Sequence, residues 1–186
     1  MVNLQHHFLI AMPHLNDYFR QTVVYVCEHN DKGSMGLVLN QPTDLSVAEL
    51  YSKLNFMTLN DRTFSNDLVL AGGPVNNERG FILHKKTPVE FQHSYNINDE
   101  LCLTTSADVI DTFGSVRAPE KYLVALGCAS WTEGQLEQEI ADNAWLVVPA
   151  NEQILFDVPY EDRYIAANQL LGILPHNFVT YQVGHS

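Results

Sequence analysis

The chain has 186 residues, of which 46% are hydrophobic and 17% charged, a composition typical of one soluble globular domain spanning residues 1–186. Its 22 acidic and 10 basic residues give a formal charge of −12, and DNA binding relies on the opposite sign, so no direct nucleic-acid partner is expected. No apolar run approaches a membrane span and the N-terminus lacks a basic leader segment, so we expect a cytoplasmic protein that binds no membrane.

The first part of the chain predicts strands before helices. Residues 22–29 and 35–41 are rich in β-branched and aromatic side chains and flank a short loop with a glycine, which predicts a β-hairpin. Ser46 and Glu49 then stand in capping-box register, which predicts the start of an amphipathic helix.

The rest of the chain alternates between apolar runs and short helical patterns. The expected strands are 68–73, 80–84, a strand–turn–strand unit over 94–106, 121–131 and 145–150. The expected helices are 106–114 with Ser106 as N-cap, one opened by Thr132 and Gln135 in capping-box register, and 159–172. Strands outnumber helices and most connections resemble hairpins, so we predict an α+β domain whose central mixed, largely antiparallel and barrel-like sheet carries flanking helices.

Known catalytic and cofactor motifs are absent from the sequence, including the glycine-rich nucleotide loops and the H-E-x-x-H zinc motif. The three cysteines (Cys27, Cys102 and Cys128) are odd in number and lie in apolar stretches, which favours buried, reduced thiols. A histidine group at His6, His7 and His14 is either a metal site or a solvated cluster, and no Cys or acidic partner lies at ligand spacing. We therefore expect no metal and no cofactor.

The segment LAGGPVNNERGFILH, residues 70–84, is the best candidate for a ligand site. Gly72 and Gly73 expose backbone, Arg79 offers a guanidinium fork for a carboxylate or phosphate, and His84 follows on the next apolar run. A plain turn between two strands explains the same residues, because glycine and proline are common in turns. Both interpretations stay open at the level of the sequence.

An acidic segment follows near residue 133. Glu137 and Glu139 lie on a predicted helix that follows Trp131. Paired carboxylates are suited to acid–base catalysis. A solvated acidic helix face is the simpler explanation of the same residues. A third interpretation is an interface for a protein partner, since Trp is a common interface anchor.

Three long blocks together resemble the YqgE/AlgH family of bacterial proteins, in the family's order. They are HFLIAMPHLNDYFRQTVVYVCEHNDKGSMGLVLNQP, LAGGPVNNERGFILH and ALGCASWTEGQLEQEIADNAWLVVPA, and ILFDVPYEDRYIAANQLLGI extends the match to about Ile173. The chain has Cys128 where the family usually has an aromatic residue. The resemblance implies a cytosolic α+β domain of a family often labelled transcriptional regulators, with no established catalytic residues to carry over.

Two classes of function fit these observations. The first is a regulatory or binding protein that influences transcription through a protein partner or a small anionic ligand, in keeping with the absence of known catalytic motifs from the sequence. The second is an enzyme that acts on a small anionic molecule, with Arg79 as anion anchor and His84 as acid or base. Convergence of both side chains and a carboxylate on one pocket would favour the enzyme.

Overall fold

The computed structural model describes residues 3–15, 17–54 and 67–172, and within them ten strands form one sheet. The strands are β1 (His7–Ala11), β2 (Val23–Asn30), β3 (Gly33–Val38), β4 (Pro42–Ser46), β5 (Leu68–Ala71), β6 (Val75–Lys85), β7 (Ser94–Asn96), β8 (Leu101–Thr104), β9 (Tyr122–Thr132) and β10 (Trp145–Pro149). The helices are α1 (Val47–Lys53), α2 (Asp108–Asp111), α3 (Gln135–Ala141) and α4 (Arg163–Leu170), with a π-helix, η1 (Gln153–Asp157), and a 3-10 turn, η2 (Tyr160–Asp162).

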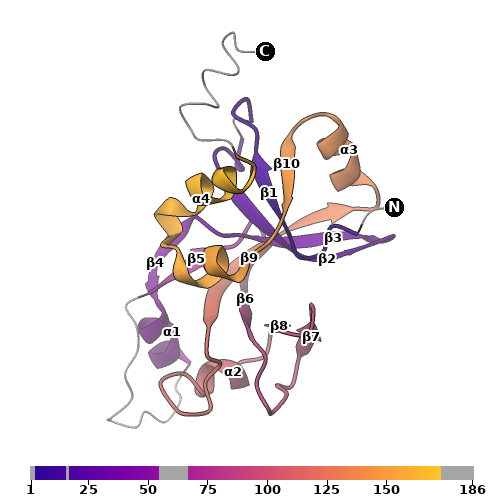
Figure 1. Cartoon of the computed structure of the whole chain (residues 1–186). Coiled ribbons are helices and arrows are strands. Elements are labelled where there is room, and N and C mark those ends of the chain that lie inside the picture. Colours follow the sequence, from indigo (N-terminus) through magenta and orange to yellow (C-terminus); the bar gives the residue numbers. More distant parts are fainter. Residues whose placement is uncertain (1–2, 16, 55–66, 173–186) are drawn as a thin grey trace.

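Strand β9 is the centre of the sheet. The order runs β10-β1-β2-β3-β9-β6-β8-β7, and β5 adds to β9 in the parallel direction while β4 pairs with β5. All other described pairings are antiparallel, so the predicted mixed and largely antiparallel sheet is confirmed. The sheet curls into a half-barrel, with α3 near one end and α1 and α2 at the other (Figure 1).

Apolar side chains fill the space on both sides of the curled sheet. One cluster includes Phe8, Tyr25 and Leu83 and is closed by η1 and α4. A second lies between the sheet and α3 and contains both tryptophans, and a third packs α1 and α2 against β5, β6 and β9. Each flanking helix therefore covers an apolar part of the sheet, as expected of an α+β domain.

Local signals in the sequence locate several elements correctly. The predicted hairpin is the β2–β3 pair, and the predicted capping box is present: Glu49 N donates to Ser46 Oγ at 3.1 Å, and Ser46 N donates to Glu49 Oε1 at 3.2 Å. All three cysteines are free and buried, as expected.

Two predicted helix starts are wrong in detail. Helix α2 begins after Ala107 without a side-chain cap, because the Ser106 hydroxyl donates to Asp108 Oδ1 instead. Helix α3 begins after Gly134, whose φ of 74° suits glycine, and only half of the predicted capping box forms, with Thr132 N donating to Gln135 Oε1.

The turn expected between the predicted strands 68–73 and 80–84 is mostly strand. Strand β6 begins at Val75, and its register against β9 shifts between Val75 and Gly80. Strands β5 and β6 do not pair with each other, because both pair with β9. The segment is therefore a crossing from one side of β9 to the other rather than a hairpin turn.

Candidate functional site

The glycines of this crossing are explained by close backbone packing. A Cβ on Gly72 would lie 2.3 Å from Gly127 O, and one on Gly73 would lie 2.2 Å from the Cys128 backbone. Gly72 N donates to Leu126 O, and Gly72 O accepts from Val38 N, both at 2.8 Å. The backbone groups of Gly72 are thus used within the sheet, and only glycine fits where the chain passes so close to β9.

Arg79 lies on the wall of a cleft of about 460 Å³. Its Nη2 donates to Thr105 Oγ1 at 3.2 Å, and its guanidinium carbon lies 5.8 Å from the centre of the Phe81 ring. The Arg79 side chain is exposed, and no ion pair is found for it within the described part of the chain. The guanidinium is therefore held in position but keeps donors for another group.

The cleft combines an apolar lining with polar groups from several strands. The apolar lining comes from Met35, Val75, Phe81 and Leu103, and the polar groups are Glu28, Asn76, His93, Ser94, Tyr95, Thr105, Cys128 and Ser130. Burial raises the pKa of the Cys128 thiol, which outweighs the opposing effects of Asn76 and the Arg79 charge. The thiol is therefore protonated at neutral pH and is a poor nucleophile.

His84 faces away from this cleft. Alternate residues of a strand point to opposite faces, so Arg79 and Phe81 share one face of β6 while Ile82 and His84 share the other. The structure does not bring together the two residues on which the enzyme interpretation depends. The sequence spacing alone could have shown that Arg79 and His84 point to opposite faces, because residues five apart in one strand do so. That conclusion required knowing that β6 extends back to Arg79.

The His84 ring is satisfied inside the fold. Only 1% of the residue is exposed, Nδ1 lies 2.8 Å from Lys85 O, and Nε2 lies 2.6 Å from Thr104 Oγ1. Because a carbonyl only accepts hydrogen bonds, Nδ1 carries the proton and Nε2 accepts from the Thr104 hydroxyl. Burial also lowers the pKa of His84, which favours the neutral ring.

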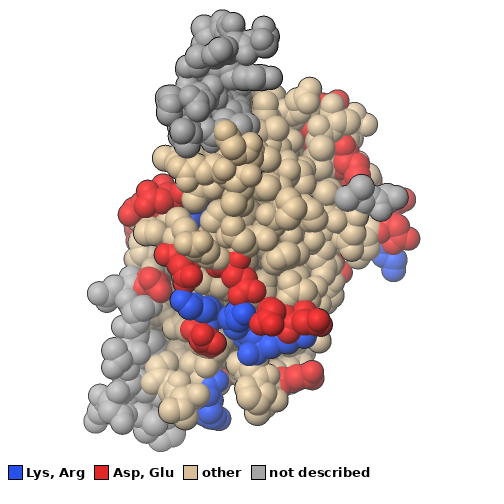
Figure 2. All heavy atoms as spheres, viewed as in Figure 1, with Lys and Arg blue, Asp and Glu red and all other residues tan. Residues whose placement is uncertain are grey.

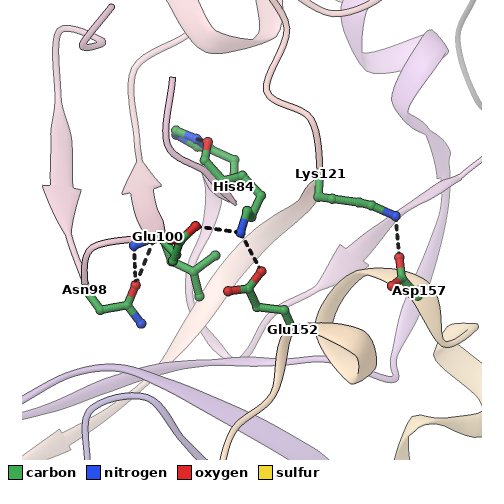
Figure 3. A network of polar contacts seen from close by, with 8 residues as sticks. His84, Asn98, Glu100, Lys121, Glu152 and Asp157 are labelled. Atoms are coloured by element: carbon green, nitrogen blue, oxygen red, sulfur yellow. Dashed lines mark hydrogen bonds and ion pairs between the residues drawn. The ribbon is translucent and has the colours of Figure 1, made fainter. Parts of the chain in front are cut away.

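An ion-pair network lies beside His84. Lys85 Nζ lies 2.9 Å from Glu100 Oε2 and 2.7 Å from Glu152 Oε1, and Lys121 Nζ lies 2.5 Å from Asp157 Oδ1 (Figure 3). The hydrogen bonds that Lys85 Nζ donates to Glu152, which has the larger effect, and to Glu100 raise the pKa of Lys85. Figure 2 shows acidic and basic side chains interleaved in a band across the viewed face, with further acidic groups toward its edges. The network links η1 and the residue before it to the end of β6 and the start of β9. Because its charges neutralise one another, the network is a weaker candidate for ligand binding than the cleft.

The three residues proposed as an interface are bound within the fold. Trp131 is 4% exposed and donates through Nε1 to Glu139 Oε1 at 3.1 Å. Glu137 Oε2 lies 3.1 Å from His29 Nε2, and a hydrogen bond from its own backbone N–H, followed by the His29 ring, lowers the pKa of Glu137. These side chains hold α3 on the sheet, and Trp131 is too buried to act as an anchor for a partner.

The first two histidines of the chain make hydrogen bonds within the fold. His6 Nδ1 lies 2.8 Å from the Tyr25 hydroxyl and His7 Nδ1 lies 3.0 Å from Gln5 O. Within residues 3–15, 17–54 and 67–172, no group of three or more His, Cys, Asp or Glu side chains is arranged to hold a metal ion. Over the same residues, no helix is long and apolar enough to cross a membrane.

Comparison with known proteins gives matches over nearly the whole chain. A family model described as AlgH-like (DUF179) matches residues 8–176. UPF0301 proteins of Haemophilus influenzae strain PittEE and Pasteurella multocida strain Pm70 are 72% and 71% identical over 186 residues, covering 100% of both chains in each case. The solution structure of the AlgH protein from Pseudomonas aeruginosa has 43% identity and a TM-score of 0.78, covering 100% of this chain and 97% of that one. A crystal structure from Corynebacterium diphtheriae, at 17% identity and a TM-score of 0.71 over 95% and 91% of the two chains, shares the fold.

Proposed function

Since the chain belongs to the AlgH-like family, we propose that it is a binding protein rather than an enzyme, and that the Arg79 cleft takes a small anionic ligand. The observation that carries this proposal is the Arg79 guanidinium. It stands in a concave site with no carboxylate bound to it in the described part of the chain. A charged fork with free donors is suited to bidentate recognition of a carboxylate or phosphate.

The surroundings of Arg79 favour an anion attached to an apolar body. Each charge-assisted hydrogen bond from the guanidinium contributes about 1.5–3 kcal/mol, and the Thr105 hydroxyl lies beside it. Phe81 and Leu103 supply apolar contact surface, while the Glu28 carboxylate contributes a negative charge to the lining. Repulsion from Glu28 would direct the anionic end of the ligand toward Arg79.

Binding without catalysis accounts for the geometry better than a reaction does. His84, the acid or base of the enzyme interpretation, lies on the opposite face of β6, and the pKa of the Cys128 thiol is raised. A general acid or base must be within hydrogen-bond reach of the reacting atom, and His84 does not meet this requirement for a ligand held by Arg79.

The regulatory role implied by the family resemblance would then be indirect. With a formal charge of −12, the chain would act in transcription through a partner protein whose contact depends on the bound ligand. We place this activity in the cytoplasm, where the three free cysteines would stay reduced.

A titration with defined anions tests the site. The purified chain is titrated with benzoate, which carries a carboxylate on an apolar ring, and with inorganic phosphate while its backbone amide NMR signals are followed. We expect shifts at Phe81 and Thr105, a stronger response to benzoate, and a loss of about tenfold in affinity for Arg79→Gln, equivalent to one charge-assisted hydrogen bond.

Arg117→Gln is the matched control, because Arg117 is also exposed but lies outside the cleft. It should leave benzoate binding unchanged, and Arg79→Gln should leave the melting temperature unchanged. Equal benzoate affinity for Arg79→Gln and wild type would refute the site. A large loss of stability in Arg79→Gln would instead assign the side chain a structural role.

A further inference from the structure

A second hollow lies at the end of the sheet where β6 finishes and β9 begins. Its volume is about 540 Å³, and its walls are the segment after β6, residues 86–91, and the segment that includes α2 and leads to β9. The apolar residues of the walls are Pro88, Val89, Phe91, Val116 and Ala118. We call this hollow the valine groove.

The two valines of the groove are unusually exposed. Val116 is 102% exposed and Val89 is 71% exposed, whereas the next large hydrophobic side chain of the described residues, Tyr18, is 48% exposed. Single exposed apolar residues are ordinary on protein surfaces. Val89 and Val116 are more exposed than any other large hydrophobic side chain of the described residues, and both line the same hollow. Such a pair indicates a surface that contacts another molecule.

Local hydrogen bonds hold both valines in place. The Thr87 hydroxyl donates to Val89 O at 2.6 Å, which closes a tight turn at the first valine. On the other wall, the Ser115 hydroxyl donates to Thr112 O at 2.5 Å and accepts from Arg117 N at 3.2 Å. Because these bonds fix the loops beforehand, a partner would lose little free energy in ordering them.

The charges around the groove define the partner further. The lining holds four carboxylates, of Glu90, Asp108, Asp111 and Glu120, against two cations, Lys86 and Arg117, which gives a formal charge of −2. Asp108 is already bound by Gln92 N and Ser106 Oγ, so Glu90 and Glu120 are the carboxylates best placed to meet a partner. An apolar segment flanked by lysine or arginine complements this arrangement.

We propose that the valine groove docks a segment of another protein, which inserts an apolar side chain between Val89 and Val116 and places basic side chains beside Glu90 and Glu120. The surface is separate from the Arg79 cleft, with which it shares no lining residue. The contact rests on the groove and would stand even without a ligand at Arg79.

Photo-crosslinking in living cells tests the docking surface. The full-length chain carries p-benzoylphenylalanine in place of Val116, and the captured segment is identified by mass spectrometry and made as a synthetic peptide. We expect a segment with apolar and basic residues, whose peptide binds the purified chain. Val89→Asp should lower the crosslink yield at least fivefold and weaken the peptide affinity at least tenfold, and Glu90→Lys should weaken it in the same direction.

Ile165→Asp is the matched control, because Ile165 is an exposed hydrophobic residue of α4, away from the groove. It should leave the crosslink and the peptide affinity unchanged, as should Arg79→Gln. Circular dichroism melting curves establish that each variant is folded. The proposal is overturned by the absence of a crosslink, by capture of a second copy of this chain, a lipid or a segment without basic residues, or by a folded Val89→Asp variant that binds as well as wild type.

Discussion

One oxygen of Glu139 accepts hydrogen bonds from two tryptophan side chains. Trp131 Nε1 donates to Glu139 Oε1 at 3.1 Å and Trp145 Nε1 donates to the same atom at 3.0 Å, while Gln135 Nε2 donates to the second oxygen at 3.0 Å. Both indole rings are nearly fully buried, so they have little access to water as an alternative partner. The Glu139 carboxylate thus accepts hydrogen bonds from two indole N–H groups that would otherwise be left without a partner in the apolar cluster beneath α3.

We expect Glu139→Ala to destabilise the chain strongly. Leaving a buried donor without a partner costs about 1–3 kcal/mol, and this substitution removes the partner of two, so a loss of about 2–6 kcal/mol in the free energy of unfolding is expected. Urea unfolding followed by tryptophan fluorescence measures it. Glu133→Ala, at an exposed position just before α3, serves as the control and should change stability by less than about 0.5 kcal/mol. An unchanged urea midpoint for Glu139→Ala would show that the indoles find other partners.

At the scale of elements, Arg163 joins three separate parts of the chain. From the start of α4 its Nη1 donates to Leu39 O at 2.7 Å, and its Nη2 and Nε donate to Leu155 O and Val158 O, both at 3.0 Å. Burial lowers the pKa of Arg163 to about 10, so the guanidinium stays charged at neutral pH. Its planar fork thereby holds η1 and the end of β3 against α4.

Arg163→Lys should fail to replace this fork. An ammonium group is a compact point donor and does not span three carbonyls set around a planar guanidinium, so at least one buried carbonyl loses its partner. We expect a loss of about 2–4 kcal/mol in the free energy of unfolding, measured by chemical denaturation. The same exchange at the exposed Arg117 should be nearly neutral. Equal denaturation midpoints for Arg163→Lys and wild type would rule out a requirement for the guanidinium geometry.

Elements with local signals were predictable, and those made by distant contacts were not. The hairpin and the Ser46 capping box depend on neighbouring residues, so their patterns are visible in the sequence. The π-helix η1 depends on Arg163 and on Lys121, whose positions beside it follow only from the fold. At the site, the sequence singled out Arg79 by its residue type but did not reveal why position 72 must be glycine, because the close approach of Gly127 is a long-range contact.

At the scale of the whole molecule, the strongly acidic net charge opposes contact with polyanions such as DNA. Among its ten basic residues, Lys85 and Lys121 are in ion pairs, and Arg163 is buried against carbonyl groups. In the face shown in Figure 2, cations alternate with carboxylates and form no patch of one sign. A DNA duplex needs a surface of cations that displaces its counterions, whereas a cleft with one accessible guanidinium is matched to a single small anion.

Direct DNA binding by the purified chain should therefore be absent or weak and independent of sequence. The formal charge of −12 repels the phosphate backbone, and ten basic residues, two of which (Lys85 and Lys121) are held in ion pairs, offer too small a gain from counterion release to overcome that repulsion. The measurement is a titration of fluorescently labelled genomic fragments at physiological salt, repeated at lower salt. We expect a dissociation constant weaker than about 10⁻⁵ M, in the range of non-specific binding. Retention of particular fragments at submicromolar protein would contradict this expectation. Any influence of this protein on transcription should instead depend on protein partners, and the Arg79→Gln and Val89→Asp variants test the ligand-dependent contact and the contact at the valine groove separately.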